Sequence, residues 1–193
     1  ITVVIVHGGG PRIKIELAKL GIESQFIKGL RITDKQTMSV VEKVLIEFNS
    51  EIIKKLRNKE CKADGLNVSQ NNIFIVDQES KDLGFVGRPK KILNKKIENI
   101  VNQQQIPVIS PMGKDEKGEK YNINADTAAA AIAKSLKSRR LLLMTDVAGV
   151  YDENKKLINE IKPAEAKNLI DKKIVEGGMI PKLLNSIDAI ENG

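Results

Sequence analysis

The chain has 193 residues, of which 41% are hydrophobic and 30% charged, a composition typical of one large globular domain or two small ones. Its apolar runs are far shorter than the roughly 20 residues that cross a bilayer, and a single Cys and a single His exclude a disulfide framework and a zinc cluster, so we expect a cytoplasmic protein with no metal site of its own. The net charge of +7 comes from lysines scattered along helical stretches with few aromatic residues between them, which favours a solvated surface over a nucleic-acid or membrane partner.

Alternating apolar runs and helical periodicities predict an α/β fold. The apolar runs predict strands at residues 1–6, 72–76, 106–109 and 141–144. The periodicity predicts helices at residues 11–20, 34–59, 94–104, 126–137, 163–172 and 181–191, with hairpin turns at 114–118 and 152–155. Such alternation is typical of a mostly parallel open sheet with helices on both faces, and the change near residue 137 predicts two lobes, residues 1–137 and 138–193.

A glycine turn follows the first predicted strand. The glycines at 8–10 separate this strand from a helical pattern that opens with Pro11, and such a turn lets backbone N–H groups approach an anion at a helix N-terminus. A second glycine turn, at 177–178, precedes Lys182. Two turns of this kind suggest the phosphate chain of a nucleotide held from both sides. We interpret His7, between strand and turn, as a structural imidazole bonded to the backbone.

A further polar cluster lies at residues 29–34, just before the longest predicted helix. Asp34 is expected to be the N-cap of that helix, because an aspartate side chain can accept a hydrogen bond from the first free N–H groups. Arg31 has no helical role, and it is either a clamp for a carboxylate or part of a surface ion pair.

Another polar cluster leads into the alanine-rich helix predicted at 126–137. Asn122 and Asn124 alternate along an extended segment, so both should face the same side. Asp126 or Thr127 is expected to cap the helix, and the alternative is that the two amides and the Asp126 carboxylate together grip a polar ligand.

Residues 145–151 follow the last predicted strand, and they either connect two elements or hold a nucleotide base and ribose. Residues 82–88 are typical of a tight turn between strands. Met144 and Met179 are expected in the core rather than in any chemistry.

Taken together, the order and spacing of these clusters resemble the acetylglutamate kinases, a family of the amino acid kinase superfamily. The motifs are HGGGP at 7–11, GLRITD at 29–34, DLGFVG at 82–87, YNINADT at 121–127, TDVAGVY at 145–151 and GGMIPK at 177–182. The resemblance implies a three-layer αβα sandwich in which an amino-acid lobe precedes a nucleotide lobe. It also implies ATP-dependent phosphorylation of the side-chain carboxylate of N-acetyl-L-glutamate, the second step of arginine biosynthesis, with Mg²⁺ held mainly by the nucleotide.

The resemblance also implies roles for individual residues. Lys182 would be catalytic by stabilising charge on ATP and the transition state, and Asp126 would be catalytic by orienting lysines. The residues implied to bind the phosphoryl group are Gly8 and Gly9, and those implied to bind the amino-acid substrate are Gly9, Gly10, Arg31, Asn122 and Asn124. The residues implied to bind the nucleotide are Thr145, Asp146, Val147, Gly149, Gly177 and Gly178.

The proposed acceptor fits a chain whose single His has a structural role. A carboxylate with a pKa near 4.3 is ionised at neutral pH, so its phosphorylation requires positioning and charge neutralisation rather than a general base. The resemblance further implies a homodimer or a hexamer, with arginine as an effector and the PII signalling protein as a partner in some forms.

The residues leave three alternative functions open, and the sequence differs from the family's pattern at both ends. The alternatives are a related kinase acting on glutamate, aspartate, carbamate or UMP, a dinucleotide-binding oxidoreductase, and a non-catalytic regulatory module; the oxidoreductase lacks the GxGxxG spacing, because position 13 is Ile13. The departure is that the family's first strand, with its lysine, and the end of the nucleotide lobe have no counterpart here. We therefore expect a chain incomplete at both ends, inactive by itself although the full-length protein is active.

Overall fold

A computed structural model describes residues 2–191, and the chain divides into two compact units, residues 1–128 and 129–193. The division falls inside helix α4 (Ala125–Ser135), whereas the sequence placed a change of role at 137/138. The assignment of an amino-acid lobe and a nucleotide lobe to these parts stays a prediction.

The first unit contains a three-stranded parallel sheet in the order β1-β7-β4. Its strands are β1 (Ile5–Val6), β7 (Ile106–Ile109) and β4 (Ala63–Leu66). Strand β7 has the predicted bounds, and β1 is the end of the predicted run at 1–6, of which residue 1 lies outside the described residues. Strand β4 was not predicted, because its sequence, Ala-Asp-Gly-Leu, has neither an apolar run nor an alternating pattern. It lies close under α2 (Lys35–Arg57), since a Cβ on Gly65 would come within 2.7 Å of the Asn49 side chain.

A second, mixed sheet in the order β6-β5-β8-β9 completes the first unit together with a small hairpin. The sheet contains β5 (Phe74–Gln78), β6 (Gly87–Ile92), β8 (Met112–Lys114) and β9 (Lys120–Asn122). The predicted hairpin turn at 114–118 joins β8 to β9. The predicted turn at 82–88 overlaps a short 3₁₀ helix (Lys81–Leu83) and the start of β6, and it belongs to the connection from β5 to β6. The small hairpin pairs β2 (Phe26–Ile27) with β3 (Leu30–Arg31).

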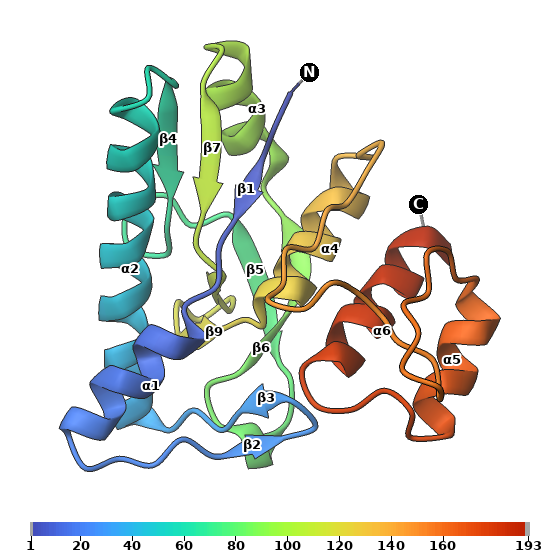
Figure 1. Cartoon of the computed structure of the whole chain (residues 1–193). Helices are drawn as coiled ribbons and strands as arrows, with labels where there is room; N and C mark the ends of the chain where they lie inside the picture. The colour runs from blue at the N-terminus through green and yellow to red at the C-terminus, as the bar shows by residue number, and fades with distance from the viewer. Residues whose placement is uncertain (1, 192–193) are drawn as a thin grey trace. The chain divides into compact units, whose positions relative to one another are not determined.

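All six predicted helices are present, each within about two residues of its predicted bounds. In addition to α2 and α4 they are α1 (Gly10–Lys19), α3 (Asn94–Asn102), α5 (Pro163–Asp171) and α6 (Met179–Glu191). The predicted N-cap is confirmed, because Asp34 Oδ1 accepts a hydrogen bond of 2.7 Å from the Thr37 N–H at the start of α2. Figure 1 shows α2 running alongside β4, and α2 also packs on α1 and β7. Its buried face therefore joins both helices and the parallel sheet into one core.

The second unit has its own small core between α5 and α6. The buried residues of this core are Ala166, Val175, Leu183 and Ile187, and Met179 packs against them as predicted. The turn predicted at 152–155 is present, with Asp152 Oδ1 accepting from the backbone N–H groups of Asn154 and Lys156, but it closes only a single bridge between Tyr151 and Leu157.

The strand predicted at 141–144 is absent. Among residues 2–191 no strand pairs with this segment, and a β-strand needs a neighbour to satisfy its backbone hydrogen bonds. Leu142 and Met144 are 78% and 89% exposed, so the placement of Met144 in the core was also wrong. The prediction of a strand at 141–144 was wrong because an apolar run does not reveal whether a neighbouring strand is available for pairing.

The predicted α/β class, with helices packed on a parallel sheet, is confirmed by this architecture. Within residues 2–191 no helix is both long enough and apolar enough to cross a membrane.

Gly84 fixes the close approach of the β5–β6 connection to the segment that carries Arg31. Its φ is +67°, and a Cβ at this position would lie 2.4 Å from the Thr33 carbonyl oxygen. Gly118 has a similar φ of +87° but open space around its Cα, so it is a matched control. We expect Gly118→Ala to cost about 1 to 2 kcal/mol for the left-handed backbone, and Gly84→Ala to cost at least about 1 kcal/mol more because a backbone overlap cannot relax cheaply. Denaturant unfolding measures both, and equal losses would contradict the close approach.

Candidate active site

A cavity of about 210 Å³ in the first unit gathers the predicted substrate-binding and phosphoryl-binding residues. It is lined by the glycine turn, the β2–β3 hairpin, the end of β9 and the start of α4. The predicted residues on its wall are Gly8, Gly9, Gly10, Arg31, Asn122 and Asn124. Six positions spread over more than 110 residues of sequence thus surround one space, although their individual roles stay predictions.

The glycine turn lies between β1 and α1, as the sequence predicted. A Cβ on Gly9 would fall 2.7 Å from the Leu45 side chain of α2, whereas a Cβ on Gly10 would meet nothing within 4 Å. Gly9 is therefore required for close packing, and Gly10 leaves room in the cavity. Helix α1 begins at Gly10 with Pro11 in its first turn, and its first intrahelical bond runs from Ile13 N–H to Gly9 O at 2.9 Å. The N–H groups before Ile13 have no acceptor inside the helix, which makes this turn suitable for an anion.

His7 holds the base of the turn, and the prediction of a structural imidazole is confirmed. Its Nδ1 donates to Gly8 O at 3.0 Å, and its Nε2 accepts from Asn49 Nδ2 at 3.1 Å. The same Asn49 amide donates to Val108 O at 2.9 Å, so one side chain of α2 links the residue after β1 to β7. Burial lowers the pKa of His7 below its ordinary value of 6.5, which keeps the ring neutral in this network.

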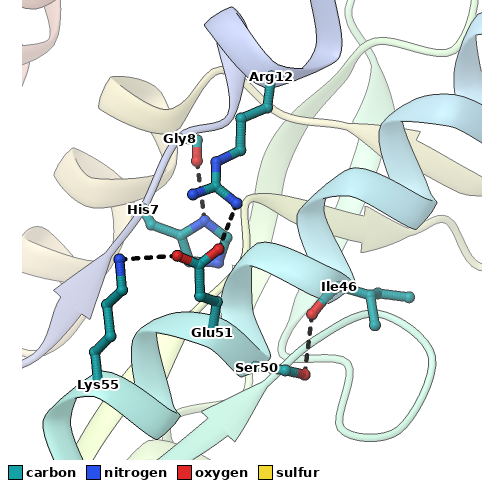
Figure 2. A network of polar contacts seen from close by, with 7 residues as sticks. All are labelled: His7, Gly8, Arg12, Ile46, Ser50, Glu51 and Lys55. Carbon is teal, nitrogen blue, oxygen red and sulfur yellow. Dashed lines mark hydrogen bonds and ion pairs between the residues drawn. The ribbon is translucent and has the colours of Figure 1, made fainter. Parts of the chain in front are cut away.

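An ion-pair network on the surface fixes the first turn of α1 against α2 (Figure 2). Arg12 and Lys55 reach Glu51 from two sides, with N–O distances of 2.5 and 2.9 Å, and the Arg12 guanidinium also lies 3.9 Å from the centre of the Phe48 ring. These two cations lower the pKa of the Glu51 carboxyl to about 2. Because the side chains are partly exposed, the network orients the turn more than it stabilises the fold.

Arg31 is the charged residue of the cavity wall. It is only 8% exposed, and burial lowers the pKa of its guanidinium without removing the charge. Its Nη1 donates to Ser24 Oγ and its Nη2 donates to Gly10 O at 3.2 Å. Within residues 2–191 no carboxylate lies within ion-pair distance of it. A buried cation without an anionic neighbour is costly, so this position is suited to an anion supplied by a ligand.

Asn122 and Asn124 both line the cavity, which confirms that they face the same side. Asn122 Nδ2 lies 3.5 Å from Thr33 Oγ1. Asn124 Oδ1 accepts from the Thr127 backbone N–H at 3.0 Å, so Asn124, rather than Asp126 or Thr127, caps α4. The cap was misplaced because α4 begins one residue earlier than predicted, at Ala125. Asp126 therefore lies in the first turn of the helix, where a carboxylate interacts favourably with the helix dipole.

The sequence missed the apolar part of the cavity wall. No sequence motif identifies these apolar side chains, because they belong to separate helices, strands and loops and come together only in the folded chain. They are Ile13, Phe26, Leu30, Leu45, Val86, Pro111 and Ile123. The nearest signal was the Lys28-Gly29 pair, whose positive φ angles of 49° and 80° form the tight turn between Phe26–Ile27 and Leu30–Arg31.

The residues predicted to bind the nucleotide all belong to the second unit. Thr145, Asp146, Val147 and Gly149 lie in the irregular segment before the Tyr151–Leu157 bridge, with Thr145 Oγ1 3.2 Å from Asp146 Oδ1. Gly177, with a φ of +56°, and Gly178 precede α6, and a Cβ on either would meet nothing within 4 Å. Lys182 follows in the first turn of α6. The approach of Lys182 to Gly9, which belongs to the first unit, stays a prediction.

Comparison with known proteins assigns the chain to a family. The model of the amino acid kinase family matches residues 1–193. The chain belongs to the amino acid kinase family. Among curated members of this family, an acetylglutamate kinase of Pelagibacter ubique is 50% identical over 98% of this chain and 66% of the relative. One of Caldicellulosiruptor saccharolyticus is 44% identical over 98% of this chain and 68% of the relative. The predicted resemblance is confirmed, and the chain spans about two thirds of the length of these relatives.

Solved structures agree with the amino acid kinase fold. The crystal structure of smu.665 from Streptococcus mutans is 32% identical, with a TM-score of 0.94 over 98% of this chain and 78% of that one. An N-acetylglutamate synthase from Neisseria gonorrhoeae, in complex with coenzyme A and N-acetyl-glutamate, has a TM-score of 0.88 over 100% of this chain and 45% of that one. At 19% identity the second likeness shows the fold alone.

The neutral imidazole of His7 can be tested by NMR, because this is the only His among the 193 residues. We expect a long-range ¹H–¹⁵N spectrum to show the Nδ1–H tautomer and a pKa below 6.5. Since the unfolded chain binds this proton more readily, the stability that His7 contributes is complete above pH 6.5 and falls as the pH drops toward the folded pKa.

Asn49→Leu is the matched variant for this titration, because it removes the donor to Nε2 and leaves the Val108 carbonyl without that partner. We expect it to lower the free energy of unfolding by about 1 to 3 kcal/mol. A protonated ring at pH 7, or the Nε2–H tautomer, would contradict the network.

Proposed function

We propose that the protein to which this chain belongs transfers the γ-phosphoryl group of ATP to the side-chain carboxylate of N-acetyl-L-glutamate, the reaction that the names of its curated relatives denote. The observation that carries the proposal is Arg31, a buried guanidinium on the cavity wall with no carboxylate of residues 2–191 within ion-pair distance. Its planar fork suits the α-carboxylate of an amino acid.

The rest of the cavity supports an acylated amino acid as the ligand. Apolar side chains such as Phe26, Val86 and Ile123 form part of the wall and suit methylene and methyl groups. The amides of Asn122 and Asn124 stand beside them and can hydrogen-bond an acetamido group or a carboxylate. A free amino group would bring a second positive charge close to Arg31, which favours an acetylated over a free amino acid.

The chemistry requires no proton acceptor on the enzyme. A carboxylate oxygen of the substrate attacks the γ-phosphorus of ATP, the bond between the γ-phosphorus and the bridging oxygen breaks, and ADP leaves with that oxygen. Backbone N–H groups of the turn at Gly8–Gly10 would neutralise charge on the equatorial phosphoryl oxygens. Lys182 would act from the nucleotide side and Asp126 would orient cationic groups. These roles stay proposals.

The nucleotide would bind the second unit at Thr145, Asp146, Val147, Gly149, Gly177 and Gly178. The open space around Gly177 and Gly178 fits a phosphate chain drawn close to the backbone. Mg²⁺ would be held mainly by the phosphates, its common binding mode in kinases, and would neutralise part of their charge.

The oligomeric state and the regulation of the protein are proposed from its resemblance to the family. We propose a homodimer, built through α2, or a hexamer, with arginine as an effector and the PII protein as a partner. A cytoplasmic location is proposed on the same grounds. Light scattering of the full-length protein with and without arginine separates the two oligomers.

Arg31→Ala tests the proposed carboxylate clamp. In the full-length protein we expect the KM for N-acetyl-L-glutamate to rise about 100-fold, since charge-assisted hydrogen bonds contribute about 1.5 to 3 kcal/mol each. The KM for ATP should change less than about threefold. Lys182→Ala is the matched comparison, and it should lower kcat by orders of magnitude with a modest change in the acetylglutamate KM. An unchanged acetylglutamate KM in Arg31→Ala would remove Arg31 from the substrate site, and faster turnover of glutamate, aspartate or carbamate would replace the proposed substrate.

A further inference from the structure

The β2–β3 hairpin presents two side chains to the Arg31 guanidinium. Ser24 Oγ accepts a hydrogen bond from Nη1, and the Phe26 ring lies under the guanidinium with 4.8 Å between the Arg31 Cζ atom and the ring centre. The Gly10 carbonyl accepts from Nη2 at 3.2 Å. Three contacts from two elements therefore define where the charge lies.

The register of the hairpin explains why these two residues meet Arg31. Phe26 is the direct cross-strand partner of Arg31, and Ser24 lies two residues earlier. The chain between them is extended, because Ile32 N–H donates to Gln25 O at 2.9 Å and continues the pairing of the hairpin. Residues two apart in an extended chain face the same side. Ser24 and Phe26 are thus on the face that meets the guanidinium, and Gln25 between them is on the other.

We propose that Ser24 and Phe26 are positioning residues, which hold the Arg31 guanidinium in the orientation that receives the carboxylate of the substrate. This inference rests on the proposed function. An arginine side chain has many rotamers, and ordering it on binding would weaken affinity. The hydroxyl and the ring fix it before the ligand arrives. Two of its five N–H groups are used by Ser24 and Gly10, and three remain for a carboxylate.

Neither residue touches the reacting atoms in this scheme, so their effect should appear in substrate affinity and not in the chemical step. The experiment is steady-state kinetics of the full-length protein with Ser24→Ala and Phe26→Leu. We expect the KM for N-acetyl-L-glutamate to rise about 3- to 10-fold in each variant, with kcat and the KM for ATP within about twofold of the parent values. When each change is combined with Arg31→Ala, Ser24→Ala should not raise the KM further, because the group that it positions is gone. Phe26→Leu should then raise the KM much less than it does in the parent protein, because only the contact of its ring with the cavity remains.

The conservative variants and a matched control separate positioning from general damage to the hairpin. Ser24→Thr keeps the hydroxyl and Phe26→Tyr keeps the ring, so both should restore the parent KM. Gln25→Ala changes the neighbouring exposed side chain on the other face, and it should leave the KM unchanged. Thermal melting of each variant confirms that it is folded.

The failures of the two proposals are distinguishable. If the parent protein turns over N-acetyl-L-glutamate while Ser24→Ala and Phe26→Leu keep its KM, or raise it equally without Arg31, the positioning role is overturned and the proposed function stands. If the parent protein neither binds nor phosphorylates N-acetyl-L-glutamate, the proposed function fails and the positioning role fails with it.

Discussion

The charge on the Arg31 guanidinium, which no neighbouring carboxylate of the described residues neutralises, is the main constraint on the cavity. Arg31 is buried on the cavity wall, and within residues 2–191 no carboxylate lies within ion-pair distance of it. Removing a cation from water is expensive, and the backbone carbonyl and hydroxyl that it contacts compensate only in part. The charge remains, because an arginine does not deprotonate in proteins. In the proposed function a carboxylate of the ligand offsets this charge, and the glycine turn, the hairpin and the end of β9 line the cavity in which it would bind.

The surroundings of the glycine turn explain how it stays in position. Gly9 packs against Leu45 too closely for any side chain, and His7 and Asn49 connect β1, α2 and β7 by hydrogen bonds inside the first unit. On the surface, Glu51 binds Arg12 in the first turn of α1. The buried hydrogen bonds of His7 and the surface ion pair of Arg12 thus hold the same glycine turn. Its N–H groups are therefore ordered before any ligand arrives. Preordered donors of this kind are what phosphoryl transfer requires.

The sequence predicted the features that depend on local pattern. Helices α1 to α6, strand β7, the Asp34 cap and the structural role of His7 follow from periodicity, capping chemistry and turn composition, and the motif order identified the family. Features that depend on distant partners could not be predicted in this way. Strand β4 has no apolar run and is held by packing under α2, the segment 141–144 has an apolar run but no neighbouring strand within the described residues, and the apolar wall of the cavity comes from separate elements. The Asn124 cap was missed because it depends on where α4 begins to within one residue.

The recognition of an α-carboxylate by Arg31 is tested by isothermal titration of the full-length protein with N-acetyl-L-glutamate and with its α-carboxamide, which keeps the size, the acetyl group and the side-chain carboxylate. We expect the α-carboxamide to bind at least about 30-fold more weakly, because Arg31 then faces a neutral group and its desolvation is not compensated. Equal affinity for the two compounds would show that no buried cation recognises the α-carboxylate, and it would rule out this role of Arg31.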